Sequence, residues 1–339
     1  MRRAFCLLAC LLLFSLPVQG YGGQLTTKLE LDLDSPHELS HSTWGLITMA
    51  NQGAHLGLFF RQGDDLDWRL DEAYVDFRQG ALDLRIGKQR MAWGTALQIN
   101  PTDVLNPIDI EDPMGDKLPI WALLGDYYLP GDWKITGVYI PYLQPAQEVL
   151  PTTPPSKVPS PDKTFANGEY AFKITRFGLG SFDFSLSYFN GWERFPHPGG
   201  FRPLEAFGFD LAGALGDLGL WAEAQLARPT PGEDFLHFIV GGDYRLDTGL
   251  YLAAQYYYRD GEDYLLGALE KDLGLHKFKM GTLYNLDQEA FALMPSIVFS
   301  LADATSFTVG IRYVHTDNLG LPGLGKAGKW GYGELEYRF

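Results

Sequence analysis

Apolar and polar side chains alternate along nearly the whole chain with a period of two residues. The clearest runs are residues 25–34, 72–78, 182–188 and 306–313, in which most alternate side chains are apolar. A period of two places successive side chains on opposite faces of a β-strand, whereas a helix repeats about every 3.6 residues. No stretch after residue 21 has a convincing helical period. The sequence therefore predicts an all-β fold whose strands have one apolar face.

The alternating runs number about 18, and 16 strands are also compatible with the pattern. They cover residues 22–34, 42–51, 55–62, 69–78, 81–90, 119–129, 132–140, 167–177, 181–189, 204–214, 217–227, 235–246, 249–259, 262–271, 275–285, 289–300, 305–315 and 330–339. Connections after even-numbered strands are tight, and every long connection follows an odd-numbered strand, at residues 91–118, 141–166, 190–203 and 316–329. This asymmetry is typical of outer-membrane barrels, which have short periplasmic turns and long external loops. We therefore expect a transmembrane antiparallel up-and-down β-barrel.

The first 20 residues follow a different pattern. Two arginines precede an apolar run over residues 4–16, and the small residue Gly20 follows. This order is typical of a secretory signal peptide, and the run is shorter than the ~20 apolar residues of a membrane-spanning helix. We expect cleavage after Gly20, which leaves residues 21–339 as a single barrel domain. Acylation at Cys10 as in a lipoprotein is disfavoured, because the apolar run continues past that residue.

The chain ends on an alternating run whose last residue is aromatic. Tyr337 and Phe339 lie on one side of the strand expected over residues 330–339. This ending resembles the C-terminal strand signature of Gram-negative outer-membrane β-barrel proteins, in which the barrel-assembly machinery reads the terminal aromatic residue. The resemblance implies that Tyr337 and Phe339 are the assembly signal and that the outer membrane of a Gram-negative bacterium is the location. It also implies outer-membrane lipid, lipopolysaccharide and the assembly machinery as partners.

Closure of the sheet follows from this location. Each unpaired backbone N–H or C=O group in hydrocarbon costs several kcal/mol, so a sheet crosses a bilayer only when it has no free edge. A barrel of 16 to 18 strands is too wide for side chains alone to fill it and usually encloses an aqueous channel. The default expectation is a pore.

The charge of the chain disfavours one class of partner, nucleic acid, and leaves the ion selectivity of the expected pore open. The chain has 27 basic and 42 acidic residues and a net charge of −15, which disfavours nucleic acid as a partner. Acidic and basic residues of the expected lumenal faces are close to balance, so selectivity is set at whatever constriction exists. The candidate pore-lining residues are Asp76, Arg78, Arg85, Lys88, Arg90, Lys134, Arg259 and Arg312.

The segment after the fifth strand breaks the alternation. It reads GKQRMAWG over residues 87–94 and NPTDVLNP over residues 100–107. These phrases resemble a motif in a family of largely uncharacterised Gram-negative outer-membrane barrels that is distantly similar to alginate-export porins. Because its proline steps disfavour a regular helix or strand, residues 91–118 either fold inward as a constriction or form an external loop. The constriction candidates are Trp93, Asn100, Asp103, Asn106 and Asp109.

No metal or other cofactor is expected. The carboxylates of residues 103–116 have the oxygen chemistry that Ca²⁺ prefers, but the spacing is not that of an EF-hand, and a solvated acidic loop is favoured. Both cysteines, Cys6 and Cys10, lie in the expected signal peptide, which excludes disulfides and thiolate metal sites from the mature chain.

The function that fits these features best is passive diffusion of small polar solutes or an oligosaccharide through a water-filled lumen. The main alternative is a structural or adhesive barrel that acts through its external loops. A barrel enzyme is less favoured, because none of the seven histidines belongs to a recognisable catalytic phrase. A transporter of hydrophobic compounds would need an N-terminal plug and an apolar lumen. The solute and the oligomeric state, monomer or trimer, stay open.

Overall fold

The computed structural model describes residues 20–35, 38–51, 53–62, 66–97, 99–108, 117–146, 158–316 and 327–339. The predicted signal peptide therefore lies outside the described residues, except for its last position, Gly20.

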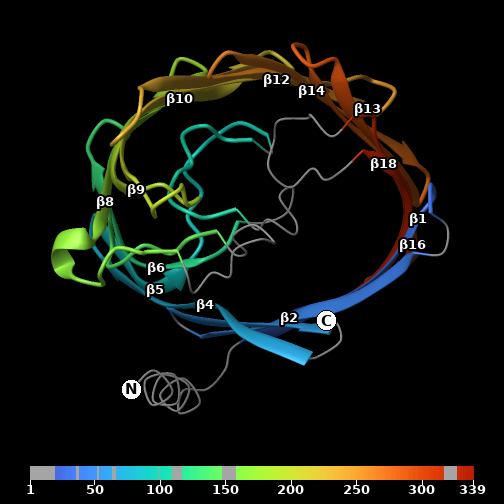
Figure 1. Cartoon of the computed structure of the whole chain (residues 1–339), viewed down its shortest axis with the longest axis horizontal. Helices are drawn as coiled ribbons and strands as arrows, with labels where there is room; N and C mark the ends of the chain where they lie inside the picture. Colours follow the sequence, from blue (N-terminus) through green and yellow to red (C-terminus); the bar gives the residue numbers. More distant parts are fainter. Residues whose placement is uncertain are drawn as a thin grey trace.

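In these described ranges, 18 strands form one closed antiparallel sheet (Figure 1). Each strand pairs with its neighbours in sequence, and β18 pairs with β1 to close the cylinder, with Leu25 opposite Tyr337. The strands are β1 (Gly20–Asp32), β2 (Leu39–Asn51), β3 (Ala54–Gln62), β4 (Leu66–Gln79), β5 (Leu82–Gln89), β6 (Ile120–Leu129), β7 (Trp133–Ile140), β8 (Glu169–Leu179), β9 (Phe182–Trp192), β10 (Pro203–Leu215), β11 (Leu218–Pro229), β12 (Phe235–Arg245), β13 (Leu250–Arg259), β14 (Glu262–Leu273), β15 (His276–Asn285), β16 (Ala290–Ala302), β17 (Thr305–Val314) and β18 (Gly328–Arg338). A short 3₁₀ helix, η2 (Phe165–Asn167), precedes β8.

The predicted all-β barrel is confirmed, including the number of strands and their order. The largest differences in strand bounds occur near the start of the chain. β1 begins at Gly20 and β2 at Leu39, because Tyr21 pairs with Met49 and Leu31 pairs with Leu39. A partner backbone thus extends both strands past the ends of the alternating pattern.

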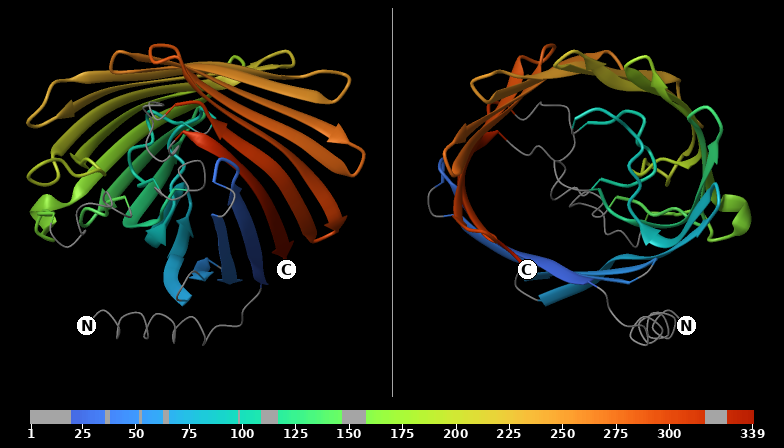
Figure 2. Two further views of the ribbon diagram at one scale, coloured as in Figure 1. Left: turned by 45° about the vertical axis from the view of Figure 1, so that its right-hand side comes forward. Right: turned by 180° about the vertical axis from the view of Figure 1, so that it is seen from behind.

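The two ends of the barrel differ as the sequence indicates. Short turns follow the even-numbered strands, and the long connections after β5, β7, β9 and β17 all leave the sheet from its opposite end. We call these the turn end and the loop end. Gly80 and Gly216 have φ angles of 60° and 62° in two tight turns, a conformation that glycine adopts without steric cost. Figure 2 shows the tilted strands and both rims.

The outer surface of the cylinder is apolar. Leu29 and Phe77 are about half exposed although they lie in paired strands, and many other large apolar side chains share this position. A continuous apolar exterior around a sheet without a free edge is what a bilayer requires. Among the described residues, no helix is long and apolar enough to cross a membrane.

A bulge between β3 and β4 places two carboxylates next to the start of the segment that follows β5. Leu56 pairs with Ala73 and Leu58 with Leu70, so Asp71 and Glu72 together face the single residue Gly57. The extra residue changes the direction of the local side chains. Both carboxylates of this bulge therefore reach the start of the segment after β5.

Candidate functional site

The segment after β5 runs inside the barrel (Figures 1 and 2). Residues 90–97 and 99–108 follow the end of β5 and extend across the lumen, where Gln255 of β13 donates a hydrogen bond to the carbonyl of Leu97 at 2.7 Å. We call these described residues the inserted segment. Of the two arrangements that the sequence left open, the inward one is the arrangement of these described residues.

Glu223 of β11 is the main contact between the inserted segment and the wall. Its carboxylate accepts hydrogen bonds from the backbone N–H of Thr95, from that of Ala96 at 2.6 Å and from that of Thr102 at 3.1 Å. The Thr102 hydroxyl adds a fourth, at 2.9 Å. Glu223 is only 1% exposed, and such burial of a carboxylate is stable because N–H and O–H donors replace water.

Lys173 of β8 makes a second contact between the wall and the inserted segment. Its ammonium group donates to the Trp93 carbonyl at 2.6 Å and lies 5.4 Å from the centre of the Trp93 ring. Asp210 of β10 balances the charge, with a carboxylate oxygen 2.9 Å from the same nitrogen.

Arg194, in the connection after β9, joins that connection to the inserted segment. The guanidinium pairs with the buried Glu169 carboxylate at 2.8 Å and donates to the Leu105 carbonyl at 2.7 Å. Nearby, Arg202 forms a more exposed pair with Glu193 at 2.6 Å, and that hydrogen bond raises the pKa of the Arg202 guanidinium. Arg194 thus connects the loop end of the barrel to the inserted segment in the lumen.

Asn106 closes the inserted segment on itself. Its side-chain oxygen accepts the Met91 backbone N–H at 2.9 Å, and its amide nitrogen donates to the Leu118 carbonyl at 2.8 Å. Both ends of the connection are therefore held together at one buried residue.

The two bulge carboxylates fix the start of the inserted segment. Arg90 forms a bidentate pair with Asp71, with both N–O distances at 2.7 Å, and its backbone N–H donates to Glu72 at 2.7 Å. Asp103 pairs with Lys117 at 2.9 Å. Arg90 and Asp103 are therefore fixed by neighbouring groups of opposite charge.

Apolar contacts complete the docking. Met91, Trp93 and Leu105 are buried against inward-facing side chains of the wall. Those wall side chains are Ile120, Ala122, Val138, Ile140, Ala171, Phe189, Leu204, Ala206 and Ala227. The sequence assigned apolar side chains to the lipid, and this part of the wall is an exception. Its inner face is apolar because the inserted segment covers it.

Gly94 lies where the inserted segment closely approaches the wall. A Cβ atom at this position would lie 2.6 Å from a Glu223 carboxylate oxygen and 2.7 Å from the Asn100 Cβ. We expect Gly94→Ala to lower the free energy of unfolding by about 1–3 kcal/mol through overpacking. Urea titration followed by tryptophan fluorescence measures the change. Gly137→Ala is the control, because its Cβ would be 3.9 Å from the nearest atom; equal effects of both substitutions would contradict the prediction.

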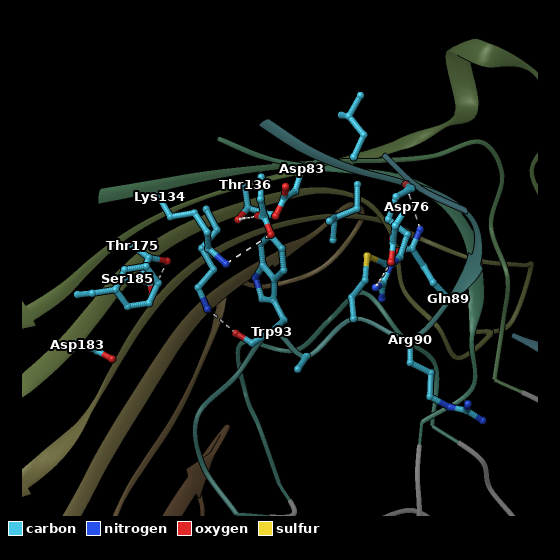
Figure 3. A pocket seen from close by; sticks show the side chains of 18 of the residues that line it. Asp76, Asp83, Gln89, Arg90, Trp93, Lys134, Thr136, Thr175, Asp183 and Ser185 are labelled. Atoms are coloured by element: carbon cyan, nitrogen blue, oxygen red, sulfur yellow. Dashed lines mark hydrogen bonds and ion pairs between the residues drawn. The ribbon is translucent and has the colours of Figure 1, made fainter. Parts of the chain in front are cut away.

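A cavity of about 870 Å³ lies on the turn-end side of the inserted segment (Figure 3). Five predicted pore-lining residues line it, namely Asp76, Arg78, Arg85, Arg90 and Lys134, together with the constriction candidate Trp93. The charged groups of the wall form cross-strand pairs: Arg85 with Asp76 at 2.6 Å, Arg78 with Asp83 at 2.8 Å, Lys134 with Asp126 at 3.6 Å and Lys173 with Asp210 at 2.9 Å.

The structure places three predicted pore-lining residues away from this cavity. Lys88 donates to the backbone carbonyl of Leu70. Arg312 of β17 pairs with Glu30 of β1 at 3.1 Å, far around the wall. Arg259 ends β13, close to the loop end. The basic residues named from the sequence therefore do not form one group.

The other constriction candidates lie within the inserted segment or beyond it. Asn100 contacts the Gly94 position, and Asp103 and Asn106 have the partners given above. Asp109 lies outside the described residues.

The C-terminal residues extend the β1–β18 ladder. Phe339 and Gly23 exchange two backbone hydrogen bonds, at 2.9 and 3.0 Å, and the rings of Tyr337 and Phe339 stack at 5.9 Å. Both side chains are about half exposed on the outer surface. Their predicted role as an assembly signal stays a prediction.

Sequence reasoning missed the residues that hold the inserted segment. Glu223 and Lys173 have the alternation of any charged residue on a lumenal face, and Arg194 lies in a long connection. The alternation of a strand indicates on which face of the wall a side chain lies, but it does not identify the group that the side chain contacts in the lumen. Within the described ranges, no group of three or more histidine, cysteine or carboxylate side chains could hold a metal ion.

Comparison with known proteins agrees with this architecture. A family described as "Protein of unknown function (DUF1302)" matches residues 53–217, which include the inserted segment. No curated protein matches the sequence. Among solved structures, OccK2 (OpdF) of Pseudomonas aeruginosa is 11% identical with a TM-score of 0.59, and the alignment covers 95% of this chain and 98% of that one. The chain has the fold of an outer-membrane β-barrel.

Two further structures place the chain among large barrels of the same fold. The outer membrane protein opdK of Pseudomonas aeruginosa is 8% identical with a TM-score of 0.58, over 95% of this chain and 99% of that chain. Wzi of Escherichia coli, described as a carbohydrate-binding β-barrel involved in group 1 capsule assembly, is 10% identical with a TM-score of 0.58, over 94% and 84%. At these identities the likeness establishes the fold.

Proposed function

We propose that this outer-membrane β-barrel is a channel for passive diffusion of small polar solutes, including oligosaccharides, through a water-filled lumen. The observation that carries the proposal is a segment fixed inside a closed barrel with a charged cavity beside it. The inserted segment, which contains Trp93, Asn100, Asp103 and Asn106, acts as the constriction. The pore-lining residues at this level are Asp76, Arg78, Arg85, Arg90 and Lys134. No covalent chemistry or cofactor is part of the mechanism.

The physical basis is preorganisation. A constriction selects among solutes when its groups are held in place, and the contacts of Glu223, Lys173 and Arg194 hold the inserted segment without the help of a ligand. The paired charges keep the cavity wetted while adding little net field. Transfer through such a lumen follows the concentration gradient of the solute.

Planar-bilayer recording tests the channel directly. Purified chain in a phospholipid bilayer is expected to give stepwise openings. In a tenfold gradient of KCl, the reversal potential is expected to stay close to zero, because the basic groups that line the cavity are paired with carboxylates. A barrel that is folded but silent would contradict the channel and favour the structural or adhesive alternative. Lipid hydrolysis by the pure protein would instead indicate an enzyme.

A further inference from the structure

We propose that the cavity beside the inserted segment selects uncharged, polyhydroxylated solutes, such as a neutral oligosaccharide, over anionic or cationic solutes of the same size. This inference rests on the proposed function, in which solutes enter the lumen. It names the class of solute from the chemistry of the cavity wall.

The first step is the state of the charges. The five basic side chains that line the cavity each form an ion pair, at distances from 2.6 to 3.6 Å. An anion that lost water on entry would therefore find every lining cation already paired. Four of the five lining carboxylates pair with these cations, and Asp183, at the turn end, accepts the backbone N–H of Gly178 at 2.7 Å. A cation likewise gains little there.

The second step is the kind of hydrogen bonding that the wall offers. Thr136, Thr175 and Ser185 lie on three consecutive strands, β7 to β9, among the ion pairs (Figure 3). Thr136 donates to Asp126, and the hydroxyls of Thr175 and Ser185 lie 3.1 Å apart. These three hydroxyl residues are themselves buried, so partly exposed ion pairs such as Arg85 with Asp76 present the donors beside acceptors. A sugar hydroxyl both donates and accepts, so it matches such a wall without carrying a charge.

The third step is the opposite side of the cavity. There the inserted segment contributes Arg90, Met91, Ala92, Trp93 and Thr95, of which the apolar Ala92 is exposed whereas Met91 and Trp93 are buried. A mainly polar lining with an exposed apolar residue suits a solute with both hydroxyl groups and C–H faces. The volume of about 870 Å³ lies within the range of ~300–1,000 Å³ that is usual for small-molecule sites.

This selectivity differs from what an alginate exporter would need. Alginate-like chains carry a carboxylate on each sugar, and their recognition requires cations that are not already paired. The cavity offers pairs instead, so the inference separates this barrel from a channel for acidic polysaccharides.

Three trisaccharides that differ in charge test the inference in wild-type protein. Maltotriose, trigalacturonate and the chitosan trimer are titrated into detergent-purified full chain, with binding measured by calorimetry and by tryptophan fluorescence. We expect maltotriose to bind about tenfold more tightly than either charged trimer, since a charge without a partner loses its water. Equal or tighter binding of a charged trimer, or no binding of maltotriose, would overturn the inference.

Opposite substitutions in one ion pair sharpen the test. Lys134→Gln leaves Asp126 without its cation, and we expect the chitosan trimer to bind about tenfold more tightly. Asp126→Asn leaves Lys134 unpaired, and trigalacturonate is expected to gain by a similar factor, whereas the double substitution returns to the wild-type preference. Arg312→Gln is the matched control, because it changes the charge of the chain outside the cavity. Preferences that ignore the sign of the substitution would contradict the inference.

The two proposals fail in different ways. A silent bilayer with binding of maltotriose alone would remove the channel and leave the selectivity of the cavity. Stepwise conductance with equal binding of all three trimers would remove the selectivity and leave the channel. Far-UV circular dichroism checks that each variant retains the barrel.

Discussion

Replacing Glu223 by glutamine is expected to release the inserted segment from the wall and to raise the single-channel conductance. The carboxylate accepts the backbone N–H groups of Thr95, Ala96 and Thr102, and an amide would turn a donor toward one of them. Loss of one hydrogen bond to a charged group costs about 2 kcal/mol, which corresponds to about 30-fold faster hydrogen exchange at these amides. Exchange followed by mass spectrometry and bilayer recording measure the two effects.

The control for this substitution is Glu270→Gln in β14. Glu270 lies 3.3 Å from Lys277 and 3.9 Å from Lys279, away from the inserted segment. Exchange at Thr95 and Ala96 is expected to stay at the wild-type rate. If Glu223→Gln left that rate unchanged, Glu223 would not hold the segment. Faster exchange without a change in conductance would show that the segment is not the constriction.

Replacing Arg194 by methionine is expected to lower the free energy of unfolding by about 3–5 kcal/mol. Glu169 has no exposed surface, and its carboxylate would remain buried without the guanidinium that lies 2.8 Å away. The Leu105 carbonyl would lose its donor as well. Urea titration of the barrel in phospholipid vesicles gives the change in unfolding free energy.

Two further variants isolate the cause of this loss. Arg194→Met combined with Glu169→Leu is expected to recover most of the stability, because an apolar pair replaces an unpaired buried charge. Arg202→Met removes a more exposed pair, with Glu193, and is expected to cost about 1 kcal/mol or less. Equal losses for Arg194→Met and Arg202→Met would argue against burial of Glu169 as the source.

The barrel could be predicted from the sequence because its signal is local. A strand that faces lipid on one side and water on the other repeats every two residues, as in β9, and a short turn marks every second reversal. The terminal Phe339 and the position of the long connections added independent support. The order of the strands, and their number to within two, therefore followed from these features.

The interior could not be predicted in the same way. Val138 and Ile140 are apolar and face inward, where the inserted segment covers them, whereas Ile135 on the same strand is exposed outside. Alternation within one strand cannot show that a distant segment covers the inner face of that strand in place of water. Asp103 pairs with Lys117, which lies close to it because the connection folds back on itself.

The order of residues along the chain has a consequence for how the barrel matures. The amide of Thr95 and the carboxylate of Glu223 are 128 residues apart in sequence, and Leu97 and Gln255 are 158 apart. Contacts between such distant residues form late, because the intervening chain must first be ordered. The inserted segment therefore emerges long before the strands that hold it, and the barrel acquires its narrow bore only when β11 and β13 have joined the wall.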